Sequence, residues 1–63
     1  MARYTEIQAT VLAHGRSAVL LEHDGAEEWI PHSLIEGLVS DEEIGAQVDV
    51  EVADWKLREL GWD

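Results

Sequence analysis

Apolar and polar residues alternate in two segments of the chain, one near each end. Across residues 5–13 the odd-numbered positions from Ile7 to Val11 are apolar and their neighbours are mostly polar, and across residues 47–52 every even-numbered position is valine. A period of two places successive side chains on opposite faces of a β-strand. We therefore predict two strands here, each with one buried face.

Two further strands are predicted on either side of the dipeptide Asp24-Gly25, over residues 18–23 and 26–31. An Asp-Gly pair between two strands favours a type I′ hairpin turn, because both central residues then adopt positive φ. The second of these strands is expected to end at Pro31, which has no backbone N–H to donate.

Short helical turns are predicted in the second half of the chain. Residues 32–35 fit a single helical or 3₁₀ turn, with Ser33 capping it. Residues 55–60 fit a terminal helix that has Asp54 as its N-cap and Gly61 just past its end.

Two loop predictions depend on individual residues. Gly15 lies between the first two predicted strands and is free to adopt positive φ there. Ser40 and Glu43 have the spacing of a capping box, which indicates a short helical turn in the loop before the last strand.

This order of elements predicts one all-β domain over residues 1–63: a small antiparallel SH3-like barrel with a 3₁₀ turn and a short C-terminal helix. An OB-like barrel is the alternative, but it usually needs more residues and a helix within the barrel order. Leu57 or Leu60 is expected to cover one barrel end. The predicted core consists of Ile7, Val11, Val19, Leu21, Ile30, Leu34, Ile35, Val48, Val50 and Val52.

Acidic residues dominate the charge of the chain, which has 63 residues and a formal net charge of −10. No lysine or arginine occurs between Ser17 and Trp55. A surface of one sign repels nucleic acid and anionic membranes and attracts basic surfaces. No apolar run reaches the roughly 18 residues of a membrane span, and the first residues lack a signal-peptide pattern, so we expect a cytoplasmic protein without membrane contact.

The segment 24–35 reads Asp-Gly-Ala-Glu-Glu-Trp-Ile-Pro-His-Ser-Leu-Ile. Together with the valine-rich strand and the tryptophan near the start of the last helix, it resembles short phage and bacterial SH3-like barrel proteins that carry Trp-Ile-Pro-x-Ser-x-Ile after an Asp-Gly hairpin. The resemblance covers residues 5–61 and implies the barrel fold and a phage or bacterial origin, but no catalytic residues. His32 stands where such proteins frequently have a basic residue.

Protein–protein interaction is the predicted function, with a basic protein or a second copy of the chain as the partner. A nucleic-acid mimic is the alternative: its carboxylates would replace phosphates and inhibit a DNA-binding host or defence protein. A solvated acidic surface that only keeps the protein soluble would have the same composition. The candidate contacts are Glu27, Glu28, Asp49 and Glu51 for charge, and Trp29 and Trp62 for apolar anchoring.

The three tryptophans have two expected roles. Trp29 and Trp55 are large apolar side chains that could cover the barrel ends of a small core. Trp62, next to the terminus, is expected to be the most exposed of the three. Tryptophan is also favoured at interaction hot spots.

Enzymatic, metal-binding and direct nucleic-acid-binding functions are not expected, and no cofactor is predicted. Ser33 is adjacent to His32, but neighbouring residues seldom face each other as nucleophile and base. The chain has no cysteine, and His14, His23 and His32 do not have a known metal-ligand spacing. The side chains of His23 and Asp24 are expected to diverge at their tight turn. Nucleic-acid binding would need a basic groove, which four basic residues at scattered positions do not provide.

Overall fold

A computed structural model of the chain describes residues 3–37 and 43–62. Its elements confirm the predicted order and add one very short strand. None of the helices in these two ranges is long and apolar enough to cross a membrane. The predicted capping box begins at Ser40, which lies outside the described residues. In chain order the elements are β1 (Tyr4–His14), β2 (Ala18–His23), β3 (Ala26–Pro31), the 3₁₀ helix η1 (His32–Leu34), β4 (Ile35–Glu36), β5 (Gln47–Ala53) and α1 (Asp54–Leu60).

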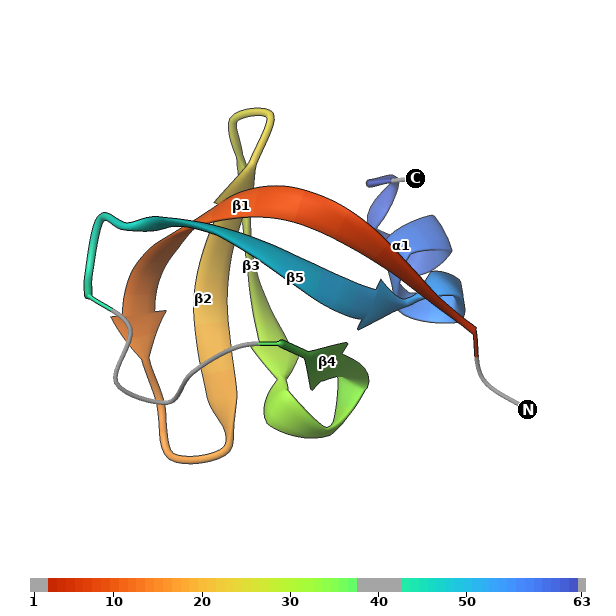
Figure 1. Cartoon of the computed structure of the whole chain (residues 1–63), viewed down its shortest axis with the longest axis horizontal. Coiled ribbons are helices and arrows are strands. Elements are labelled where there is room, and N and C mark those ends of the chain that lie inside the picture. Colours follow the sequence, from red (N-terminus) through yellow and green to blue (C-terminus); the bar gives the residue numbers. More distant parts are fainter. Residues whose placement is uncertain (1–2, 38–42, 63) are drawn as a thin grey trace.

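The five strands found within residues 3–37 and 43–62 belong to one antiparallel sheet in the order β3-β2-β1-β5-β4. Figure 1 shows that the sheet is strongly curved and that α1 lies at one of its ends. The two edge strands, β3 and β4, are connected in sequence by η1 but are not paired with each other in the described structure. Among the described residues the sheet is therefore open, because no hydrogen bonds between β3 and β4 close it into a barrel.

Strand β1 is long enough to pair with two neighbours. Its first part pairs with β5 and its second part with β2, and Thr10 has a partner on both sides. The register with β2 shifts between Val11 and Ala13, so Leu12 is an extra residue on β1. A bulge of this kind bends a strand and increases its twist, which helps to curve the sheet around the core.

The core is formed by the inward faces of the strands and by the C-terminal segment. Every residue predicted from the alternation belongs to it, with Leu34 and Val48 only partly buried against the rest. Of the two helix residues expected to cover the core, Leu57 is fully buried in it, and Leu60 is partly buried against it. Three further buried residues were not predicted: Ala9, Ala53 and Trp62.

The β2–β3 hairpin has the predicted turn. Asp24 and Gly25 adopt φ values of 52° and 85°, as a type I′ turn requires. Their strands then pair in a continuous register from the turn to Pro31, which is the last residue of β3 as expected.

Two capping predictions are wrong. Asp54 is the first residue of α1 rather than its N-cap, a position held by Ala53. The Asp54 carboxylate instead accepts a hydrogen bond of 2.6 Å from the Thr5 hydroxyl, which links α1 to the start of β1. Ser33 lies inside η1, whose N-cap is Pro31, and η1 has no side-chain cap.

Candidate interaction surface

The strands of the described part of the chain carry no lysine or arginine. Arg3 precedes β1, Arg16 lies between β1 and β2, and Lys56 and Arg58 belong to α1. Among the described residues, the only ion pair made by a lysine or arginine is within α1, between Lys56 and Glu59 at 2.7 Å. The carboxylates of the sheet are therefore not neutralised by basic side chains of the described chain.

Three glutamates lie side by side across β1, β5 and β4. Glu51 of β5 is directly opposite Glu6 of β1 on one side and Glu36 of β4 on the other. Directly opposite residues share a face of the sheet, on strands about 4.8 Å apart. All three are exposed, and like charges in this arrangement destabilise a sheet. Glu6, Glu51 and Glu36 are termed the glutamate row below.

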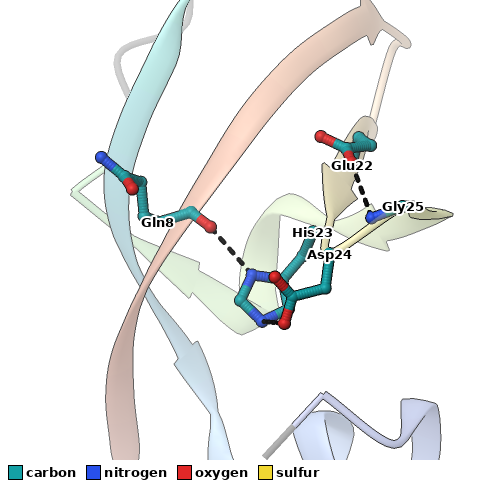
Figure 2. A network of polar contacts seen from close by, with 5 residues as sticks. All are labelled: Gln8, Glu22, His23, Asp24 and Gly25. Atoms are coloured by element: carbon teal, nitrogen blue, oxygen red, sulfur yellow. Dashed lines mark hydrogen bonds and ion pairs between the residues drawn. The ribbon is translucent and has the colours of Figure 1, made fainter.

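A second acidic group lies on the β2–β3 hairpin. Glu22 of β2 is directly opposite Glu27 of β3 on the outward face. The Glu22 carboxylate also accepts a 2.7 Å hydrogen bond from the amide of Gly25, as Figure 2 shows. Glu28 points the other way, opposite Leu21, but it is exposed because β3 is an edge strand.

The predicted contact residues do not form one cluster. Glu27, Glu28 and Trp29 lie on the edge strand β3, whereas Asp49 and Glu51 lie on β5, three strands away. At a strand spacing of about 4.8 Å, the two groups are roughly 14 Å apart around the sheet. The acidic surface therefore has two parts: the glutamate row with Asp49, and the acids of the hairpin.

The three tryptophans are exposed to different extents. Trp29 and Trp55 are each 50% exposed, so neither covers the core completely, whereas Trp62 is only 7% exposed. The expectation that Trp62 is the most exposed of the three is wrong, because its ring belongs to the core. A buried ring cannot anchor a partner without opening the core. Trp29 is the tryptophan that lies on the sheet with a large exposed area.

Apolar side chains surround Trp29 on the outward face. Leu20 of β2 lies directly opposite Trp29 of β3 on one side and directly opposite Ala13 of β1 on the other. Leu20 and Ala13 are both half-buried. The Trp29 ring also covers Gly15, where an added Cβ atom would be 3.1 Å from the ring and 3.0 Å from the carbonyl oxygen of Ala18. Gly15 does not adopt the positive φ that glycine is free to take. It is needed for the space beneath the ring instead.

His23 links the tip of the hairpin to β1, as Figure 2 shows, and its ring also contacts Trp62 of the C-terminal segment. Its Nδ1 atom is 2.8 Å from the carbonyl oxygen of Gln8, and because a carbonyl can only accept, Nδ1 carries the proton. Its Nε2 atom is 3.5 Å from the Asp24 carboxylate, so the prediction that these two side chains diverge is wrong. The imidazole also lies against Trp62, with ring centroids 5.3 Å apart.

An open polar recess lies beside this contact, with a volume of ≈ 240 Å³. Two of its lining residues, Glu22 and Asp24, are acidic, and most of the other lining side chains are polar groups that can form hydrogen bonds. The part of the chain that the structure describes contains no group of three or more His, Cys, Asp or Glu side chains that could hold a metal ion. The lining residues are Gln8, Ala9, Thr10, Glu22, His23, Asp24 and Gln47.

No protein-family model, curated protein or solved structure matches the chain. The resemblance of residues 24–35 to SH3-like barrel proteins of phages and bacteria therefore stays a prediction. The surface must be interpreted from its own geometry.

Sequence reasoning missed four residues of this surface. Glu22 and Leu20 could have been found, because counting outward from the Asp24-Gly25 turn pairs them with Glu27 and Trp29. No local signal gives the other two, Glu6 and Glu36, because their pairing with β5 joins distant parts of the chain.

Proposed function

We propose that the protein is a non-enzymatic interaction module whose outward sheet face binds a basic protein. The glutamate row carries this proposal, because Glu6, Glu51 and Glu36 lie directly opposite one another without a lysine or arginine in any strand. Such a row lowers the stability of the isolated sheet. A cationic partner would relieve the repulsion. The electric field of the glutamate row would raise the association rate with such a partner and favour it over anionic ones.

The order of the elements supports this role. A long β1 shared by two neighbours, a tight β2–β3 hairpin and a 3₁₀ turn before the last strands support the proposal of a small SH3-like barrel left open between β3 and β4. We propose that fold type for the chain. Domains of this type commonly bind segments of other proteins.

A basic partner is favoured over a second copy of the chain. Each copy has a formal net charge of −10, so contact between two acidic faces would add repulsion to the glutamate row of each. Lysine and arginine side chains of a partner would instead form cross-interface ion pairs. Imitation of nucleic acid remains the alternative proposal. Under this alternative, duplex DNA would displace the protein from its partner.

Removing two members of the glutamate row is expected to weaken binding to a captured basic protein about two- to thirtyfold, since exposed ion pairs contribute about 0.2–1 kcal/mol each. The test compares wild-type protein with the variant Glu6→Gln/Glu36→Gln in titrations at low and high salt. The control Glu43→Gln/Glu59→Gln removes the same number of charges outside the row.

The two variants separate position from net charge. Equal weakening by both would contradict a role for the row, as would binding that high salt does not weaken. Displacement of the partner by duplex DNA would favour the nucleic-acid mimic, because both would then occupy the same basic groove.

The isolated protein is expected to become more stable when Glu51 is replaced by glutamine, by about 0.2–1 kcal/mol, because its carboxylate lies between Glu6 and Glu36. Urea unfolding at low salt measures the change. Asp49→Asn is the control, since Asp49 is on the same strand and face but lies opposite the neutral Gln8. A gain for Asp49→Asn as large as for Glu51→Gln would show that only total charge matters.

A further inference from the structure

Strand β3 forms an open edge of the sheet. It pairs with β2 on one side and stands at the end of the strand order. Its residues from Ala26 to Trp29 are exposed, and only Ile30 is buried. The register with β2 is continuous, so no bulge twists this edge away. An edge of this kind is a template for pairing with another strand.

The tight β2–β3 turn determines which backbone groups point outward. In a two-residue hairpin the flanking residues, here His23 and Ala26, form a hydrogen-bonded pair, and such pairs alternate along the strands. The N–H and C=O groups of Glu27 and Trp29 therefore point away from β2. No hydrogen bond within the described residues involves these groups. Pro31 is the next β3 residue whose backbone faces away from β2, and it presents only a C=O group because proline has no N–H.

We propose that the β3 edge binds an extended basic segment of a partner protein as an added antiparallel strand. This proposal rests on the proposed function and gives the same partner a second contact, on β3, which lies three strands away from β5 of the glutamate row. Backbone pairing at Glu27 and Trp29 would supply affinity, and the side chains of β3 would select the sequence. An antiparallel segment, read from its N-terminus, passes Ile30, Trp29, Glu28 and Glu27 in turn. The complementary segment therefore has two apolar residues followed by two basic ones.

The charge of the edge selects this occupant over a second copy of the chain. Pairing of β3 with β3 would bring Glu27 and Glu28 of each copy together, and like charges across a strand pair are destabilising. Acidic residues thus protect the edge from self-pairing. If lysine or arginine residues of a partner strand lay opposite Glu27 and Glu28, they would form favourable cross-strand pairs with these two glutamates. The half-exposed ring of Trp29 offers a partner an apolar contact, or a face for an arginine.

The direct test uses the synthetic peptide Thr-Val-Leu-Lys-Arg-Thr, capped at both ends, in two N-methylated forms. Methylation at leucine and arginine blocks the amides that would face Trp29 and Glu27. Methylation at valine and lysine alters amides that face away and leaves charge and composition identical. We expect the first form to bind about tenfold or more weakly than the second, because two backbone hydrogen bonds are lost. NMR should show slowed hydrogen exchange at the amides of Glu27 and Trp29 with the second form.

A protein variant tests the same bond from the other side. Glu27→Pro removes both the carboxylate and the outward N–H, whereas Glu27→Ala removes the carboxylate alone. Proline is tolerated at outward positions of edge strands, and the shifts of the buried Trp62 ring report whether the fold is kept. We expect Glu27→Ala to weaken peptide binding a few-fold and Glu27→Pro about tenfold further. If Glu27→Pro does not fold, the methylated peptides decide the question.

Equal affinity of the two methylated peptides would overturn strand addition, as would failure of the unmethylated peptide to bind. The proposed function fails on a different measurement: it is lost if the glutamate-row variant and wild-type protein bind the captured basic protein equally well. A peptide that binds irrespective of methylation, and perturbs the glutamate row, would keep the proposed function and place the contact on the outward face.

Discussion

Replacing Leu21 with alanine is expected to remove a large part of the protein's free energy of unfolding. Leu21 is fully buried in the core, and removing a buried leucine side chain costs about 2–5 kcal/mol through lost transfer free energy and the cavity left behind. A chain of this size has a free energy of unfolding of only about 3–9 kcal/mol. The loss is therefore about half of the whole stability. Urea unfolding followed by circular dichroism measures it.

Leu20→Ala is the matched control for this variant. Leu20 is the adjacent residue of β2, but its side chain lies on the outward face opposite Trp29 and is only half-buried. Its removal should cost about 1 kcal/mol, since less apolar area returns to water. A cost for Leu20→Ala as large as for Leu21→Ala would contradict the assignment of the two faces of β2.

Strand positions and core residues could be predicted because their signals are local. The alternation around Ile7 and Val50 reports which side chains face inward without any knowledge of the partner strand. The Asp24-Gly25 turn adds the register of one hairpin, because only a few backbone conformations close a two-residue loop. These signals together determine most of the buried face of the sheet.

The glutamate row could not be predicted, because the pairing of Glu6 and Glu36 with Glu51 depends on how distant segments meet. No local sequence pattern predicts the bulge at Leu12 either, although it helps to set the curvature of the sheet. Such features follow from the packing of the whole core. They also determine which acids become neighbours on the outward face.

The burial of Trp62 did have a local signal. Gly61 ends α1 with φ 75°, and its amide donates to the carbonyl of Arg58, while the amide of Trp62 donates to the carbonyl of Leu57 at 2.8 Å. This is the Schellman motif, which usually brings the residue after the glycine into apolar contact with the last turn of the helix. Leu57, Gly61 and Trp62 have that spacing in the sequence. Proximity to the terminus was therefore a poorer guide than the helix end.

Replacing Trp62 with alanine is accordingly expected to cost about 3–5 kcal/mol, the range for buried tryptophan. Trp62 is only 7% exposed, and its ring lies against His23 at the hairpin tip. Its loss removes the apolar contact between the end of α1 and the hairpin. Urea unfolding by circular dichroism gives the change in stability, and hydrogen exchange should show the hairpin amides becoming less protected.

Trp55→Ala is the matched control, because it removes the same side chain from the same end of the chain. Trp55 is 50% exposed on α1, and its ring is 6.0 Å from the Lys56 ammonium nitrogen. A contact of that kind at an exposed site contributes about 0.5–1 kcal/mol, so this variant should remain folded and keep its hairpin protected. If the two variants lost equal stability, Trp62 would not be a core residue, and an anchoring role for its ring in partner binding would have to be considered again.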